Sequence, residues 1–125
     1  LQDKLVMKDY LTAKLYYDLG TYTGNASYTA DMRINGNNFL ACITTAQNAL
    51  KDYPYTSMRE DISILLLRAK HKLGSESVLD KKEERMRETI DEYYAFKNEF
   101  PESKYMKEVE AIYKDASKYV KELNE

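Results

Sequence analysis

A short motif that occurs twice limits the possible folds of this chain more than any other feature. In both copies an aromatic residue is followed by Pro, one further residue and a hydroxyl residue: Tyr53-Pro54-Tyr55-Thr56 and Phe100-Pro101-Glu102-Ser103. The prolines lie 47 residues apart (101 − 54), and in the same register Phe39 matches Met86 and Ile43 matches Ile90. Pro cannot continue a helix, whereas Ser and Thr often begin one. The repeat therefore predicts a helix–Pro–helix unit, which is typical of helical arrays that bind other proteins.

The composition also favours an all-α domain. The chain has 125 residues, enough for one domain or part of one, and is 43% hydrophobic and 32% charged with only 4 Gly and 2 Pro. Its net charge of −2 argues against nucleic acid as a partner, because phosphate binding needs a basic surface. No apolar run approaches the roughly 20 residues that cross a bilayer. Since the chain begins inside a helical pattern, we expect it to be part of a longer protein.

Apolar periodicity predicts five helices and no strand. The expected ranges are 2–19, 38–52, 56–73, 80–99 and 103–123. We expect residues 2–52 to form one helix pair with an inserted loop at 21–37, residues 56–99 to form a second pair, and residues 103–123 to cap the array. The faces expected to be buried comprise Leu5, Val6, Tyr10, Ala13, Tyr16, Tyr17, Phe39, Cys42, Ile43, Ala46, Ala49, Leu50, Met58, Ile62, Leu65, Leu66, Ala69, Leu73, Met86, Ile90, Tyr93, Tyr94, Phe100, Tyr105, Val109, Ile112, Tyr113, Ala116, Val120 and Leu123.

The connection around residues 21–37 is longer than the roughly 2–8 residues that usually join two helices. It mixes turn-forming residues with the aromatic side chains of Tyr22 and Tyr28. Two interpretations remain open: a surface insertion without a role, since loop closure costs rise slowly with length, or a functional loop.

Several segments carry a resemblance to a known family. The small and aromatic positions of the tetratricopeptide (TPR) pattern are occupied by Ala13, Tyr16, Phe39, Cys42, Ala49 and Pro54. The segments Ala13–Gly20, Asn48–Thr56, Lys81–Arg85 and Glu99–Tyr105 together resemble the C-terminal half of the BamD-like TPR lipoproteins of the Gram-negative β-barrel assembly machinery. The resemblance covers nearly the whole chain in order, apart from the inserted loop around residues 26–36.

This resemblance implies a right-handed superhelical array of antiparallel helical hairpins without catalytic activity or cofactor. It further implies an outer-membrane, periplasmic scaffold that contacts BamA-like periplasmic domains and reaches the membrane only through a lipid anchor outside this chain. Two other functions remain open: a generic TPR adaptor of the periplasm or cytoplasm, and a helical accessory domain of a cell-wall enzyme.

The residues themselves offer little for catalysis or metal binding. His71 is the only histidine and has no second His or Cys at ligand spacing. Cys42 falls on an apolar helix face, where we expect a small core residue. Asp91 and Glu92 are adjacent on a helix, so they point about 100° apart and make a poor acid–base pair. We therefore expect neither an enzyme nor a metal site.

One surface is a candidate for binding a partner. No charged residue occurs between Asn35 and Leu50, although charged residues are frequent elsewhere. Protein interfaces are depleted of charge at their centres. We therefore predict that the outward face of this helix contacts a protein, beside the loop tyrosines; the predicted residues are Thr44, Thr45, Gln47, Asn48, Tyr22 and Tyr28. The alternative is that other parts of the protein simply cover this face.

Overall fold

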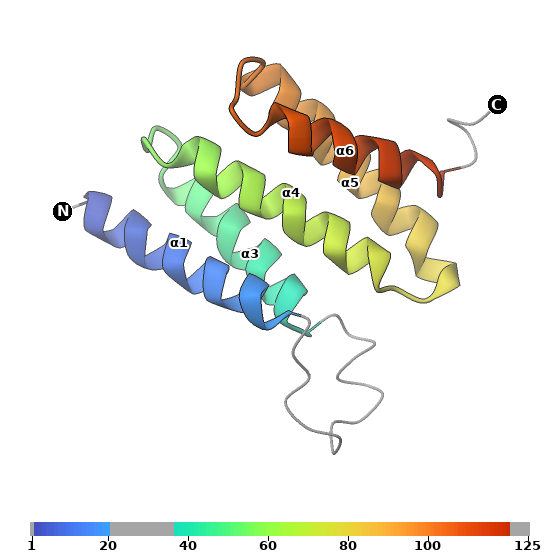
Figure 1. The fold of residues 1–125 in the computed structure, drawn as a ribbon. Coiled ribbons are helices and arrows are strands. Elements are labelled where there is room, and N and C mark those ends of the chain that lie inside the picture. Colours follow the sequence, from blue (N-terminus) through green and yellow to red (C-terminus); the bar gives the residue numbers. More distant parts are fainter. Residues whose placement is uncertain (1, 21–36, 121–125) are drawn as a thin grey trace.

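The computed structural model describes residues 2–20 and 37–120 (Figure 1). The elements in these residues are the helices α1 (Gln2–Leu19), α3 (Asn37–Asp52), α4 (Arg59–Ser75), α5 (Leu79–Glu99) and α6 (Met106–Ser117). The described residues contain no strand. The prediction of an all-α fold is therefore confirmed. None of the described helices is both long and apolar enough to span a membrane.

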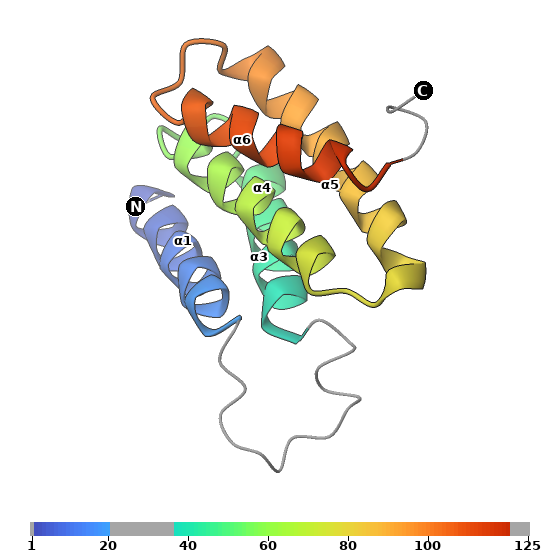
Figure 2. The same ribbon diagram turned by 45° about the vertical axis from the view of Figure 1, so that its right-hand side comes forward.

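The helices form two layers. Successive helices run antiparallel, and α3 packs between α1 and α4 while α5 packs between α4 and α6 (Figures 1 and 2). Further contacts join α1 to α4 and α4 to α6, whereas α3 and α5 make none with each other. Helices α1, α4 and α6 thus lie side by side in one layer, and α3 and α5 are separated in the other.

Helix α4 is the centre of the hydrophobic core. Ile62, Leu65 and Leu66 pack in the cluster shared with α1 and α3, whereas Ile64 and Leu67 belong to the cluster shared with α5 and α6. Sequence periodicity indicated only the first of these faces. The second was missed because a helix surrounded by other helices buries most of its circumference, so its apolar residues lose the amphipathic pattern.

The two Pro-containing linkers have the same backbone hydrogen bonds. In the first, Tyr53 N donates to Ala49 O and Thr56 N donates to Tyr53 O; in the second, Phe100 N donates to Phe96 O and Ser103 N donates to Phe100 O. The helix starts that follow match as well, with Arg59 N bonded to Thr56 O and Met106 N to Ser103 O. The sequence repeat is therefore also a repeat of local structure.

The hydroxyl residues of the two linkers lie ahead of the helices that the sequence predicted them to begin. Thr56 Oγ1 accepts a hydrogen bond from Met58 N at 3.1 Å, and Ser103 Oγ accepts one from Tyr105 N at 3.0 Å. Each hydroxyl thus closes a turn ahead of the helix, and α4 and α6 begin three residues later than expected, at Arg59 and Met106.

The helix pairs α1–α3 and α4–α5 share a second feature, which lies where the first helix of each pair ends. Gly20, directly after α1, lies against Phe39 near the start of α3, and Gly74, at the end of α4, lies against Met86 in α5. In both pairs a glycine thus allows the first helix to approach a large side chain of the second. Phe39 and Met86 follow the 47-residue register, whereas the two glycines lie 54 residues apart (74 − 20), because the two connections differ in length.

Some predicted core positions are wrong. Leu5 and Tyr94 are 47% and 51% exposed. Tyr94 lies at the surface even though its ring and hydroxyl contact Tyr113 of α6. Phe96, which the prediction omitted, is buried instead. Helix α6 ends at Ser117, ahead of the predicted end at residue 123, which lies outside the described residues.

Candidate protein-binding groove between α3 and α5

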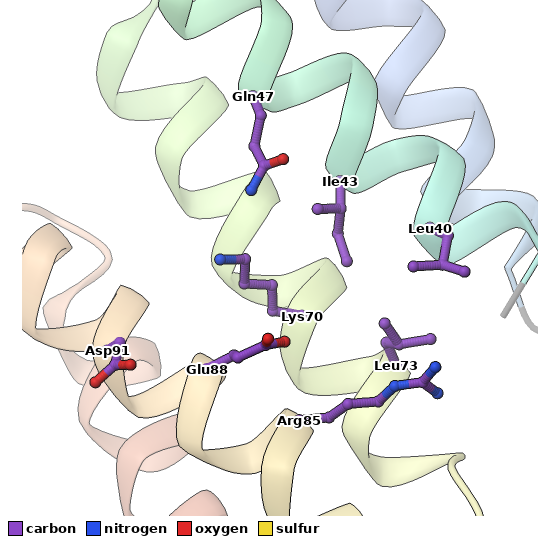
Figure 3. A pocket seen from close by; sticks show the side chains of 8 residues that line it. All are labelled: Leu40, Ile43, Gln47, Lys70, Leu73, Arg85, Glu88 and Asp91. Carbon is purple, nitrogen blue, oxygen red and sulfur yellow. The ribbon is translucent and has the colours of Figure 1, made fainter. Parts of the chain in front are cut away.

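A groove of about 230 Å³ lies where α3 and α5 diverge over α4 (Figure 3). It exists because both helices pack on α4 but not on each other. The lining residues are Leu40, Ile43 and Gln47 from α3, Lys70 and Leu73 from α4, and Arg85, Glu88 and Asp91 from α5.

The α3 side of the groove is free of charge. Leu40, Ile43 and Gln47 follow one another at helical spacing, so their side chains share one face of α3. Leu40 is 38% exposed, whereas Ile43 and Leu73 are almost fully buried and form an apolar floor. This end of the groove can take an apolar side chain, with Gln47 available for a hydrogen bond.

The opposite side of the groove is charged and partly fixed by internal bonds. Lys70 Nζ lies 2.9 Å from Glu92 Oε1 in an ion pair whose side chains are mostly buried. Arg85 Nη1 donates a hydrogen bond to Ser77 Oγ at 2.6 Å. Glu88 and Asp91 are exposed on the α5 wall. A partner in the groove therefore meets an uncharged wall on one side and carboxylates on the other.

The structure brings together part of the predicted binding surface. Thr44, Gln47 and Asn48 are exposed and Thr45 is half-buried. Of these four only Gln47 lines the groove. The predicted loop residues Tyr22 and Tyr28 lie outside the described residues.

The charged wall was missed by reasoning from the sequence. The run from Lys81 to Arg85 and the adjacent Asp91 and Glu92 resemble an ordinary solvated helix face. Asp91 lines the groove, and Glu92 is paired with Lys70, which lines the groove as well. The 47-residue register carried no signal for the wall, because it matches Arg85, Glu88 and Asp91 with three α3 residues that do not line the groove.

On the other layer, polar side chains join α4 to α6. Arg68 Nε and Nη2 donate hydrogen bonds to Glu108, at 2.6 and 2.7 Å, and this contact lowers the pKa of the Glu108 carboxyl. His71 Nε2 lies 2.6 Å from Asp115 Oδ2. These pairs are two-residue contacts between packed helices, which is the arrangement of structural bridges.

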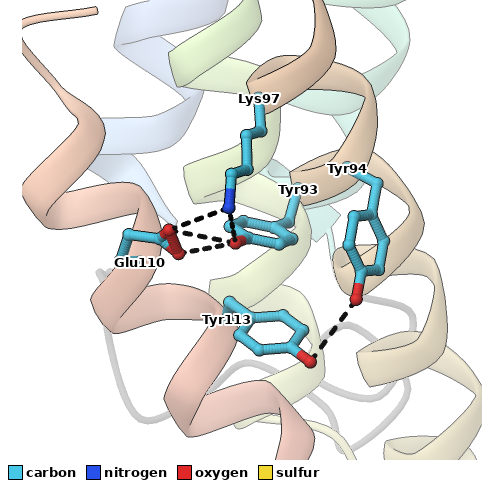
Figure 4. Close-up of polar contacts among 5 residues, drawn as sticks. All are labelled: Tyr93, Tyr94, Lys97, Glu110 and Tyr113. Atoms are coloured by element: carbon cyan, nitrogen blue, oxygen red, sulfur yellow. Dashed lines mark hydrogen bonds and ion pairs between the residues drawn. The ribbon is translucent and has the colours of Figure 1, made fainter. Parts of the chain in front are cut away.

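A tyrosine cluster holds α5 against α6 (Figure 4). The rings of Tyr93 and Tyr113 stack with their centroids 4.4 Å apart, and Tyr94 Oη bonds Tyr113 Oη at 3.4 Å. Tyr93 Oη donates a 2.5 Å hydrogen bond to Glu110, which also lies 3.4 Å from Lys97 Nζ. Burial, followed by this bond, raises the pKa of Tyr93, while the same bond lowers the pKa of Glu110. These tyrosines therefore stabilise the helix pair rather than offering a free surface.

In the part of the chain that the structure describes, no group of three or more His, Cys, Asp or Glu residues could hold a metal ion. Cys42 is fully buried, and its burial raises the pKa of the thiol from 9.0 to about 12.

No protein-family model and no curated protein matches this sequence.

Proposed function

We propose that this chain is a non-catalytic scaffold for protein–protein interaction, with the groove between α3 and α5 and the adjacent uncharged face of α3 as its binding surface. The groove is the observation that carries the proposal. It combines an apolar floor, a neutral wall and a charged wall, a mixture that suits a protein segment better than a small substrate. The repeated Pro linkers support the comparison with TPR-like arrays.

We extend the proposal to the identity of the partner on the basis of the sequence resemblance. The segments that resemble BamD-like lipoproteins suggest a BamA-type periplasmic domain as the protein that is bound. In this proposal the protein works at the periplasmic face of the outer membrane, anchored through a lipid on a part of the protein beyond this chain. A generic periplasmic TPR adaptor would use the same groove for a different protein.

The contacts of the reactive residue types support a role without chemistry. The Cys42 thiol is buried and strongly protonated, so it is a poor nucleophile. His71 is held by Asp115 in the interface between α4 and α6 and does not line the groove. Glu92 is occupied by Lys70.

The test measures binding of a purified BamA-type periplasmic domain to the chain and to groove variants. We expect Gln47→Lys and Asn48→Lys each to weaken binding by roughly 10-fold, about 1.4 kcal/mol, because an unpaired ammonium is costly to bury. Thr45→Lys should weaken binding as well. Both Gln47 and Asn48 are exposed, so the fold should persist.

The matched control is Lys81→Glu, a charge change at an exposed position near the start of α5 that does not line the groove. Its effect should be smaller and should fade with added salt. If Gln47→Lys and Asn48→Lys bind normally while Lys81→Glu abolishes binding, the assigned surface is wrong. If the BamA-type domain does not bind, but envelope extracts yield another protein whose capture depends on Gln47, the adaptor function replaces the proposed one.

A further inference from the structure

The groove between α3 and α5 indicates which kinds of side chain a partner presents to it. Its volume of about 230 Å³ is below the roughly 300–1,000 Å³ of pockets that enclose small molecules, so it suits side chains on a protein surface. The two ends of the groove differ. Figure 3 shows Leu40 and Arg85 toward one end and Gln47 and Asp91 toward the other, with Glu88 between the two α5 residues.

The end near Leu40 is apolar. Leu40 is 38% exposed, and among the described residues it belongs to none of the buried clusters of the core. The side chains of Ile43 and Leu73 lie beneath the same part of the groove. An apolar side chain of a partner would remove the exposed surface of Leu40 from water, which favours binding.

The basic side chains of the groove are already bonded within the protein. Lys70 Nζ pairs with Glu92 Oε1 at 2.9 Å, and the two side chains are only 18% and 21% exposed. An acidic partner that took Lys70 would leave the carboxylate of Glu92 unpaired, which is costly. Arg85 Nη1 donates to Ser77 Oγ, in the connection between α4 and α5, at 2.6 Å. Arg85 keeps its charge, but at the apolar end, roughly 9 Å from Asp91 along the axis of α5.

The carboxylates of Glu88 and Asp91 are not bonded in this way. Both residues are exposed, and neither has an ion pair or side-chain hydrogen bond within residues 2–20 and 37–120. The residues three and four positions from Glu88 on α5 are Glu84, Asp91, Glu92 and a single base, Arg85. Residues at these spacings are neighbours on a helix, and like charges there are unfavourable. A basic side chain from outside would relieve this repulsion.

The elements around Asp91 do not supply that base. Residues 37–50, which include the whole α3 wall of the groove, contain no charged residue. Arg87 lies four residues before Asp91, but its Nη2 pairs with Glu83 Oε1 at 3.0 Å. The middle and the Gln47 end of the groove are therefore negatively charged.

We infer that the groove binds a protein segment that presents an apolar side chain to Leu40 and a lysine or arginine to Glu88 and Asp91. The binding surface is that of the function proposed above, on which this inference rests; what it adds is the chemistry of the partner. Because both carboxylates are exposed, their pairing with a base adds only modest affinity. It excludes acidic segments, so its main effect is on specificity.

Position 47 tests the sign of the partner's charge. Gln47 is exposed, lines the groove and has nearly the same shape as Glu. For a basic partner, Gln47→Glu should strengthen binding by roughly twofold to threefold, whereas Gln47→Lys should weaken it. For an acidic partner both changes reverse their direction. If position 47 were buried against a partner without a matching charge, both variants would bind more weakly.

The probe is a phage-displayed library of random linear peptides, selected on the immobilised 125-residue chain. Counter-selection on Leu40→Asn, which alters the groove without changing its charge, removes peptides that bind elsewhere. We expect the remaining peptides to combine a large aliphatic side chain with Lys or Arg and to contain little Asp or Glu. Fluorescence anisotropy of the synthetic peptides then measures their affinity for the chain and its variants. Circular dichroism of every variant checks that the helices persist.

The carboxylates are tested with the same peptides. Glu88→Lys and Asp91→Lys should each weaken binding by roughly threefold to tenfold, and the loss should shrink with added salt. The matched control is Glu102→Lys, the same charge change at an exposed position in the second Pro-containing linker, outside the groove. This variant should bind the peptides normally.

Three results would overturn the inference. The selection could yield no peptide whose binding depends on Leu40. The selected peptides could be acidic or uncharged. Alternatively, Gln47→Glu could weaken their binding as much as Gln47→Lys does.

The proposed function fails separately, in the experiment with the BamA-type domain. If basic peptides bind the groove and that domain does not, the partner chemistry stands and the identity proposed for the partner is wrong. If the domain binds through Gln47 but the groove-dependent peptides lack a base, the function stands and the inference about the partner's charge is wrong.

Discussion

The Cα of Gly20 lies so close to the ring of Phe39 that a Cβ on residue 20 would stand 2.1 Å from Phe39 Cε1. Carbon atoms in contact prefer separations of about 3.5–4.0 Å, so no side chain fits there without movement of the ring or of α1. Phe39 is itself buried and packs edge to face on Tyr17, with ring centroids 5.8 Å apart. The close approach therefore fixes how α1 and α3 meet.

Replacing this glycine should destabilise the fold. Gly20→Ala should lower the free energy of unfolding by roughly 1–3 kcal/mol, the usual cost of overpacking. Gly74→Ala is the matched comparison. Its Cβ would meet the flexible Met86 Sδ at 3.1 Å, and Ala gains helix propensity, so its net change should be under about 1 kcal/mol. Urea denaturation measures both, and an equal loss for the two variants would contradict the role assigned to Phe39.

The two linker hydroxyls should differ in importance. Thr56 and Ser103 make the same bond to the backbone N–H two residues on, but Ser103 Oγ also donates to Glu60 Oε2 at 2.5 Å. Thr56→Ala should cost about 0.5–1 kcal/mol of unfolding free energy, and Ser103→Ala should cost about 1 kcal/mol more, because a hydrogen bond to a charged group is stronger. In the double variant Ser103→Ala/Glu60→Gln, the added cost of losing Ser103 should shrink. Equal costs for the two single variants would show that the Glu60 bond does not contribute.

Acid should weaken the contact between α4 and α6. Bonding to Arg68 lowers the pKa of Glu108 from its ordinary value of 4.5. A carboxyl whose pKa is lower in the folded chain stabilises the fold at pH values above the pKa that it has in the unfolded chain. This contribution is lost as the pH falls through the pKa of the folded state. Glu108→Gln should therefore reduce the free energy of unfolding at pH 7 and make its decline below pH 4.5 shallower. The side chain is 41% exposed, so solvent screening limits the effect to under about 1 kcal/mol.

The matched control for Glu108 is Glu102→Gln, at an exposed position in the second Pro-containing linker. Urea titrations between pH 3 and pH 7 should give this variant the same pH profile as the unchanged chain. A Glu108→Gln variant with that same profile would show that the Arg68 contact does not influence folding.

Cys42 should be unreactive in the folded protein. Its side chain is fully buried, and burial raises the thiol pKa to about 12, so almost no thiolate is present at pH 8. A thiol reagent such as iodoacetamide should modify the native chain at the rate at which the core opens, and the urea-unfolded chain far faster. Peptide mass spectrometry locates the modification. Rapid labelling of the native chain would mean that α3 is not packed as described.

The sequence by itself determined the helices and the repeat. The ends of α1 at residues 2 and 19 agree with the predicted range, as do the ends of α3 and α5 at Asp52 and Glu99. These boundaries depend on local chemistry: Gly20 follows one helix, and Pro54 and Pro101 cannot continue the others. The expected exposure of Gln47 and Asn48 also followed from the helical period alone.

Only the tertiary structure decided which faces are covered and where the groove lies. Leu5 and Val6 are adjacent and both apolar, yet one is exposed and the other is buried. The groove requires α3 and α5 to diverge over α4, and the α5 residues of its charged side lie more than 35 positions beyond Gln47. The spacing of apolar residues indicates which side of a helix is apolar, but not which helices pack against that side. Burial and surface shape depend on contacts between helices that are distant in the chain, and these contacts are set by packing.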